Sequence, residues 1–209
     1  MFRFSINLQL IFLYFNFQKF FQIFRVDCFH WLQLYVHHWS ETGRTGILCR
    51  RDLHSKQRIF ISTPNKFQNL GYESCWVEIS HPSQKQPILF CSFYRNLQSQ
   101  NIIFGDENDS IQQQTPGHAF NLQVFEQELK SAFQVSQHIV ICGDWNAHHQ
   151  AWLDQNADTI GEAVLDFITS NNFHILNTMP FDCTYVGHGA HSCIDISLCS
   201  SSLIHLCNN

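Results

Sequence analysis

The chain has 209 residues, of which 44% are hydrophobic and only 14% charged, and its formal net charge is −5. This length fits one domain with a full hydrophobic core and excludes a large multidomain assembly. The negative net charge argues against a protein that binds nucleic acid through phosphate neutralisation alone, although it leaves a local basic groove open.

The cysteines and the N-terminus bear on the compartment. Nine cysteines are an odd number, and no C-x-x-C pair occurs among them, which favours a reducing compartment over a disulfide framework. The apolar run at 10–15 is six residues long, far short of the roughly 18 that a membrane span needs. No small-residue cleavage site follows it. We therefore expect an intracellular protein without a membrane partner.

Residues 1–41 differ in composition and periodicity from the rest of the chain. Nine of the 20 phenylalanines fall within the first 29 residues, without a period of 2 or 3.6. Aromatic content without alternation does not specify a strand register. We interpret residues 1–41 as an atypical Phe-rich segment, either a packed element or a mis-joined stretch outside the fold, and residues 42–209 as the domain.

Strands dominate the first part of this domain. A GRTG turn at 43–46 feeds a short strand at 47–49, and a second strand is expected at 58–62. The alternating segment 75–80 and the apolar run 87–94 flank a polar loop, which predicts an antiparallel pair whose second strand is buried on both faces.

Helices and strands alternate in the remainder. A surface loop is expected at 96–117, and a helix at 118–135, where Leu122, Phe125, Leu129 and Phe133 share one face and Glu126, Glu128 and Lys130 lie between them. A second helix begins with Thr159 as its cap and ends near 171–172. Further strands are expected at 138–142, 174–176, 184–186 and 192–199. This order predicts an α/β sandwich whose helices cover a mixed sheet.

The strongest chemical signal is VICGDWNAHH at 140–149. A buried strand delivers Asp144 and Asn146 to a turn at its carboxyl end, where side chains leave the sheet and enter a crevice. The carboxylate can orient and deprotonate a water while the amide donates to a phosphate oxygen. The alternative is a structural Asx turn, in which both side chains bind only local backbone.

Two more residues complete a pattern. Tyr94 closes the strand ILFCSFY, and Asp195 lies in SCIDISLCS. A strand ending in Tyr, a helix, a strand with Gly-Asp-x-Asn-Ala, a helix and a strand-borne S-x-I-D resembles the endonuclease/exonuclease/phosphatase superfamily. Over roughly residues 42–203 it most resembles the apurinic-type endonuclease domain of non-LTR retrotransposons. The resemblance implies a four-layer, DNase I-like α/β sandwich.

The resemblance also implies roles for individual residues. Asp144 activates the attacking water, Asn146 assists it at the phosphate, Tyr94 binds the phosphate or a nearby acid, and Asp195 orients a catalytic histidine. The expected substrate-binding residues are His148, His149, Thr184 and Ser192. The implied function is Mg²⁺-dependent nicking of DNA in the nucleus, in an element that also encodes a reverse transcriptase. The ion neutralises charge that develops during phosphodiester hydrolysis.

Two parts of the family pattern have no match. The metal-binding Glu of an early Gln-Glu strand is not found, since Asp27 and Glu41 lie in the wrong context, and only His205 follows Asp195 where the family has Ser-Asp-His. We therefore expect a fold incomplete at both ends, with its metal ligands unidentified. The alternatives are a catalytically inactive remnant with at most weak DNA binding, and a secreted relative, which the odd cysteine count disfavours. No Cys/His set has zinc spacing.

Overall fold

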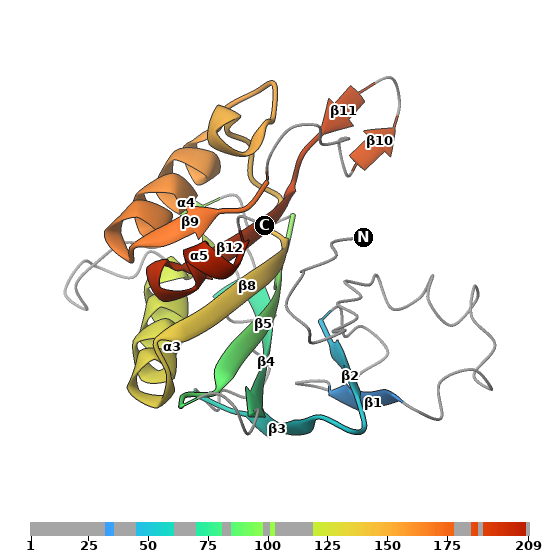
Figure 1. Ribbon diagram of the computed structural model, residues 1–209. Coiled ribbons are helices and arrows are strands. Elements are labelled where there is room, and N and C mark those ends of the chain that lie inside the picture. Colours follow the sequence, from blue (N-terminus) through green and yellow to red (C-terminus); the bar gives the residue numbers. More distant parts are fainter. Residues whose placement is uncertain are drawn as a thin grey trace.

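A computed structural model describes residues 32–35, 45–60, 70–80, 85–97, 101–102, 119–177, 185–187 and 190–207. Its centre is a six-stranded mixed sheet in the order β3-β4-β5-β8-β12-β9 (Figure 1). The strands are β3 (His54–Arg58), β4 (Tyr72–Ser80), β5 (Ile88–Arg95), β8 (His138–Asp144), β12 (Asp195–Ser200) and β9 (Phe173–Ile175). The α/β class and the mixed sheet predicted from the sequence are confirmed.

The predicted antiparallel pair forms the middle of this sheet. β4 and β5 pair from Tyr72 with Arg95 to Ile79 with Ile88, and every residue of β5 is buried. β8 then lies parallel to β5, so the intervening helix α3 (Leu122–Val135) acts as the crossover that parallel neighbours require. These elements bring the carboxyl ends of β5 and β8 to the same edge.

Two helices cover one face of the sheet. α3 and α4 (Thr159–Ser170) lie on the same side in Figure 1. The Asn121 side chain caps α3 by accepting from the Val124 N–H at 3.0 Å. Asp158, and not Thr159 as the sequence predicted, caps α4 by accepting from the Gly161 N–H at 2.6 Å. Both residue types cap well, so composition alone did not separate them.

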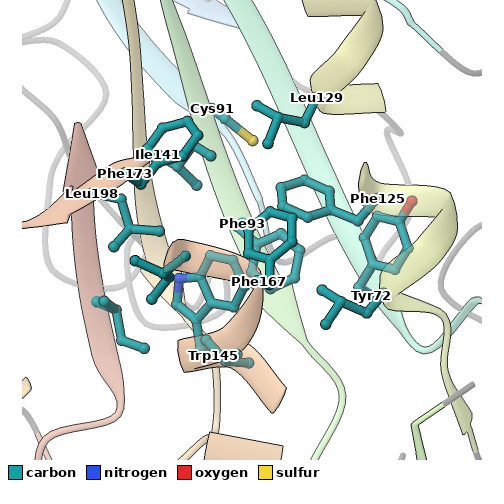
Figure 2. Packing of buried hydrophobic residues seen from close by; sticks show 14 of the residues in the cluster. Tyr72, Cys91, Phe93, Phe125, Leu129, Ile141, Trp145, Phe167, Phe173 and Leu198 are labelled. Atoms are coloured by element: carbon teal, nitrogen blue, oxygen red, sulfur yellow. The ribbon is translucent and has the colours of Figure 1, made fainter. Parts of the chain in front are cut away.

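An aromatic cluster fills the space between the helices and the sheet (Figure 2). Phe93 stacks on Trp145 at 4.1 Å between ring centroids and meets Phe125 of α3 at 4.6 Å. Phe167 of α4 packs against both Phe125 and Trp145. Burial of each large apolar side chain contributes about 1.5–3 kcal/mol, so this cluster fixes the helices and the start of the 145–149 loop together.

The opposite face has a second core. Ile47 and Cys49 of β2 (Ile47–Arg50) pack with Val77, Phe90 and Val140 of the main sheet. β2 confirms the strand predicted at 47–49. It pairs antiparallel with β1 (Leu32–Tyr35), which lies within the Phe-rich segment. No described helix is long and apolar enough to cross a membrane.

Several predicted elements differ from the structure. The helix predicted at 118–135 begins at Leu122, and the strand predicted at 192–199 is interrupted at residues 193–194. The strand expected at 58–62 is instead β3, because Lys56 and Arg58 pair with Glu78 of β4 and stabilise a polar edge strand. The expected loop at 96–117 includes β6 (Asn101–Ile102), which pairs with β7 (Ala119–Phe120); residues 103–118 lie outside the described ranges.

The remaining elements are short. They are η2 (Gln150–Trp152), β10 (Tyr185–Gly187), β11 (Ala190–Ser192), η3 (Ser201–Leu203) and α5 (Ile204–Cys207). β10 and β11 form a hairpin just before β12. η3 lies at the start of β8, since Ser202 Oγ donates to the Gln137 carbonyl and lies 2.9 Å from His138 Nδ1.

Candidate active site

Three of the predicted catalytic residues are neighbours in the sheet. Asp144, the last residue of β8, is the Cα partner of Tyr94 on β5 and of Asp195 on β12. Glu73 of β4 is in turn the partner of Tyr94. We call Glu73, Tyr94, Asp144 and Asp195 the polar row. No motif in the sequence marks Glu73, although its place opposite Tyr94 follows once the β4–β5 hairpin is aligned.

The polar row lies on the sheet face opposite α3 and α4. The intervening residues Phe93 and Ile196 belong to the helix-side core, and side chains alternate along a strand. Along the same face, the row before it is Cys75, Ser92, Cys142 and Ser197, and the one before that is Val77, Phe90, Val140 and Cys199. The face therefore changes from apolar to acidic toward the carboxyl ends of β5 and β8.

Asn146 lies in a tight turn directly after the row. Its φ of 45° is in the left-handed region, which Asn tolerates better than most residues. Its N–H donates to Asp144 Oδ1 at 2.9 Å, and its Nδ2 donates to the Arg95 carbonyl at 2.7 Å. The Asx turn that the sequence offered as an alternative is thus present, and it holds Asn146 beside Asp144.

Arg95 ties the ends of β5 and β8 together. Only 3% of Arg95 is exposed, and its Nε donates to the Trp145 carbonyl at 2.6 Å while Nη2 donates to the Asn146 carbonyl. Burial lowers the pKa of Arg95, and the charges of Asp158 and Asp144 oppose this shift. The sequence gives no sign that Arg95 is buried, because an arginine at the end of a strand usually reaches solvent.

A second cluster joins the loop after β8 to the β10–β11 hairpin. Asp154 Oδ2 accepts from Ser192 Oγ at 2.8 Å, from the Cys193 N–H at 2.8 Å and from His148 Nδ1 at 3.1 Å. Ser192 Oγ also lies 3.0 Å from His148 Nδ1. His148 and Ser192 are therefore brought together, and Asp154, which the sequence analysis missed, is the residue that joins them.

The hydrogen bonds of Asp154 hold it in the charged form. Burial alone raises the pKa of this carboxyl, but the donors from Asn156, Ser192, Cys193 and His148 outweigh burial and lower it. The side chain of Asp154 has no exposed surface, whereas that of His148 is 31% exposed. The cluster is a buried anion with one partly exposed imidazole.

His149 has a different environment from His148. Its Nδ1 accepts from the Ala151 N–H at 3.0 Å and its Nε2 lies 3.5 Å from Glu162 Oε1. Its ring packs against Trp152 at 5.3 Å between centroids, so both ring nitrogens have partners within the loop and the neighbouring helix. Thr184 lies outside the described residues.

His205 lies far from the polar row. Burial, and then the proximity of His205, lower the pKa of His138, which places His205 near the first residue of β8. Asp144 is the last residue of that strand, about 20 Å away at roughly 3.3 Å per residue. Asp27 and Glu41 lie outside the described residues.

The donor set for a metal ion is small in the described part of the chain. No group of three or more His, Cys, Asp or Glu residues there could hold one. Mg²⁺, however, keeps several waters and needs only one or two carboxylates. The neighbouring carboxylates of Asp144 and Asp195 on one sheet face fit this minimal requirement.

This arrangement defines a DNase I-like α/β fold, in which a mixed sheet carries acidic residues at the ends of neighbouring strands. The family model described as endonuclease-reverse transcriptase matches residues 88–209, more than half of the chain. The chain therefore belongs to the endonuclease-reverse transcriptase family. The matched region contains Tyr94, Asp144 and Asp195, so the resemblance seen in the sequence is confirmed.

One solved structure shows the same fold, and two further ones are more distantly similar. The endonuclease domain of TRAS1, a telomere-specific non-LTR retrotransposon, matches with a TM-score of 0.59 and 17% identity over 85% of this chain and 70% of that domain. The mannosyl-6-phosphatase Bt3783 of Bacteroides thetaiotaomicron matches with a TM-score of 0.46 and 13% identity over 84% of this chain and 65% of that protein. D. rerio TDP2, solved with a single-stranded DNA product, matches with a TM-score of 0.43 and 12% identity over 82% of this chain and 64% of that protein. No curated protein sequence matches the chain.

Proposed function

We propose that this domain hydrolyses phosphodiester bonds and nicks DNA with the help of Mg²⁺, as an endonuclease of the non-LTR retrotransposon type. The observation that carries the proposal is the placement of Tyr94, Asp144 and Asp195 as direct neighbours on three strands. The family membership of residues 88–209 supports the same reaction. DNA is then the substrate, the nucleus is the site of action, and a reverse transcriptase is the functional partner.

In this reaction Asp144 orients a water molecule and accepts its proton as the water attacks the phosphorus atom. Asn146, fixed by Arg95 and by Asp144, donates from its amide to a non-bridging phosphate oxygen. Tyr94 donates its phenolic proton to the phosphate or to a neighbouring acid. Asp195 orients a catalytic histidine, which protonates the leaving oxygen.

A divalent ion, when bound, neutralises charge that develops on the phosphate oxygens. Asp144 and Asp195 are the described carboxylates that would hold it, since both lie on the same face at the end of β8 and the start of β12. The remaining ligands are expected from water and from the phosphate itself.

A second candidate is a family member that binds DNA without cleaving it. The observation that favours it is the position of His205 near His138, at the end of β8 opposite Asp144. Cleavage and binding must therefore be measured separately.

The test is nicking of supercoiled plasmid by the purified full chain. With Mg²⁺ we expect relaxed plasmid to accumulate, EDTA to abolish this, and Asp144→Ala to reduce the rate by about 10²-fold or more. Asp166→Ala, which removes an exposed carboxylate of α4, is the matched control and should nick like the wild type. Folded protein that binds duplex DNA without nicking it would establish the second candidate.

A further inference from the structure

We propose that Asp154 is a positioning residue that holds His148 so that its Nε2 binds a phosphate of the DNA backbone beside the polar row. This inference rests on the proposed function, because it assigns a substrate contact to the same site. It goes beyond that function by naming the buried residue that makes the contact.

The side chain of Asp154 acts as the centre of a closed cluster. Its Oδ1 accepts from the Asn156 N–H at 3.0 Å, and its Oδ2 accepts from Ser192, Cys193 and His148. A fully buried carboxylate with four donors is held rigidly, because moving it would leave several buried polar groups unsatisfied. His148 Nδ1 is therefore fixed as a hydrogen-bond donor on the inner side of the ring.

The backbone of His148 is fixed as well. The Asp158 N–H donates to the His148 carbonyl at 3.0 Å, and the His148 N–H donates to Asp158 Oδ1 at 3.3 Å. A Cβ atom on Gly161 would lie 1.9 Å from the His148 carbonyl oxygen, so only glycine lets the start of α4 approach this closely. The backbone of His148 is thus held by the start of α4, and its imidazole is held by Asp154.

The free side of the ring is Nε2. His148 is 31% exposed, and within the described residues Nε2 has no hydrogen-bond partner. An imidazolium donates from both ring nitrogens. A phosphate oxygen at Nε2 would therefore complete a chain in which the cation lies between the buried carboxylate and the DNA, through charge-assisted hydrogen bonds.

The cluster lies close to the polar row, at the end of the sheet where β8 finishes and β12 begins. His148 follows Asp144 by four residues, and Ser192 precedes Asp195 by three, while Asp144 and Asp195 are direct partners. Four residues span at most about 14 Å, the axial rise of about four nucleotides. A DNA strand whose phosphate is attacked at Asp144 therefore passes within reach of His148 Nε2.

The experiment measures DNA affinity in EDTA, where cleavage does not interfere. A fluorescent 20-bp duplex is titrated with full-length wild type, His148→Gln, Asp154→Asn and the double variant at several salt concentrations. We expect His148→Gln and Asp154→Asn each to weaken binding roughly five- to tenfold. The slope of log affinity against log salt should become shallower by about one. The double variant should lose no more than either single variant.

The matched control is His174→Gln. His174 is an exposed histidine of β9 that also lies next to a serine hydroxyl, with its Nε2 3.0 Å from Ser201 Oγ. It should bind like the wild type. His148→Gln carries the test if Asp154→Asn does not fold, because His148 is partly exposed. In the DNA complex of the wild type, the ring ¹⁵N shifts of His148 should report a proton on both ring nitrogens. These shifts should change in Asp154→Asn while those of His174 stay unchanged.

The outcomes separate the inference from the proposed function. Wild type that binds and nicks DNA, with His148→Gln matching it in affinity and salt slope, would overturn the inference and leave the function intact. Wild type that neither binds nor nicks DNA would overturn both. Weakened binding in His148→Gln with the shallower slope, together with protons on both ring nitrogens of His148 in the wild-type complex, would establish the inference.

Discussion

Asp144 and Asp195 face each other directly across the antiparallel strands β8 and β12. Like charges in this position repel and destabilise a strand pair by a few tenths to about 1 kcal/mol. The fold therefore carries two acidic residues at a position where neutral residues would be more stable. Such a cost is common where the site's chemistry needs the charge.

The first prediction follows from this pair. Asp195→Asn should raise the free energy of unfolding by up to about 1 kcal/mol, because it removes the repulsion, and should lower plasmid nicking by about 10²-fold or more. Urea unfolding and the nicking assay on the same preparation measure both effects. Asp166→Asn, at an exposed position of α4, should change neither. Reduced stability in Asp195→Asn would contradict the inferred repulsion between Asp144 and Asp195.

The second prediction concerns Gly143, the residue before Asp144. A Cβ atom at this position would lie 1.8 Å from the Phe93 carbonyl oxygen, so Gly143→Ala must push β5 and β8 apart. We expect a loss of more than about 3 kcal/mol in chemical denaturation. Cys142→Ala, one residue earlier on the same strand, should lose about 1–2 kcal/mol. Equal losses in the two variants would contradict the close approach of the strands.

The third prediction concerns a buried carboxylate that the sequence pattern placed between the apolar positions of a helix. Glu128 of α3 has no exposed surface and accepts from Tyr72 Oη at 2.7 Å, Ser74 Oγ at 2.7 Å and Trp76 Nε1 at 3.0 Å. Glu128→Gln turns an amide donor toward these donors and should cost about 2 kcal/mol or more. Thermal and urea unfolding measure this loss.

The matched control for that variant lies two residues away. Glu126 is partly exposed and pairs with Lys130 at 3.4 Å, one helical turn further on. Glu126→Gln should change stability by less than about 0.5 kcal/mol. If both variants lost the same stability, the three hydrogen bonds from β4 would not stabilise the helix.

The fourth prediction is a loss of stability at alkaline pH. Burial raises the pKa of Cys49 from its ordinary value of 9.0 to about 12, although a hydrogen bond with Ser55 opposes the shift. The fold favours the neutral thiol, so this contribution is fully present below pH 9 and is lost as the pH rises toward 12. The expected slope approaches about 1.4 kcal/mol per pH unit.

Urea unfolding between pH 9 and 10 checks this prediction. Burial and the charge of Glu128 also raise the pKa of Tyr72, which adds a loss in the same direction only above the ordinary tyrosine value of about 10. Cys49→Ala should be less stable than wild type at pH 8, because it leaves a cavity, but should lose less stability between pH 9 and 10. An unchanged slope in Cys49→Ala would contradict the prediction.

The sequence predicted the parts of the fold that depend on apolar periodicity. The strands around Trp76, Phe90 and Ile141 and the helix around Phe125 have patterns that match their burial. The family resemblance implied a shared site for Tyr94, Asp144 and Asp195, and the strand pairing of the structure makes these three residues neighbours.

The residues that the sequence did not reveal are mainly buried charges. Arg95, Glu128 and Asp154 look like surface residues in the sequence, since charged side chains are rarely buried without partners. Most of their partners lie between 6 and 56 residues away and meet them only when the chain folds. The bounds of the polar edge strand β3 could not be predicted for a related reason. Its ion pairs with Glu78 stand where an apolar alternation would otherwise mark a strand.

One face of the sheet changes from apolar to acidic side chains along the strands, so packing of the apolar core fixes the register that aligns the acidic residues. Val140 and Cys199 are partners on the same face of β8 and β12 as Asp144 and Asp195. A slip of one residue between these strands would turn one carboxylate into the aromatic cluster and one apolar side chain toward water. The packing of the apolar residues in each strand therefore sets the relative position of the two acids. A substitution that disrupts this packing would first misalign Asp144 and Asp195, even at a distance from them.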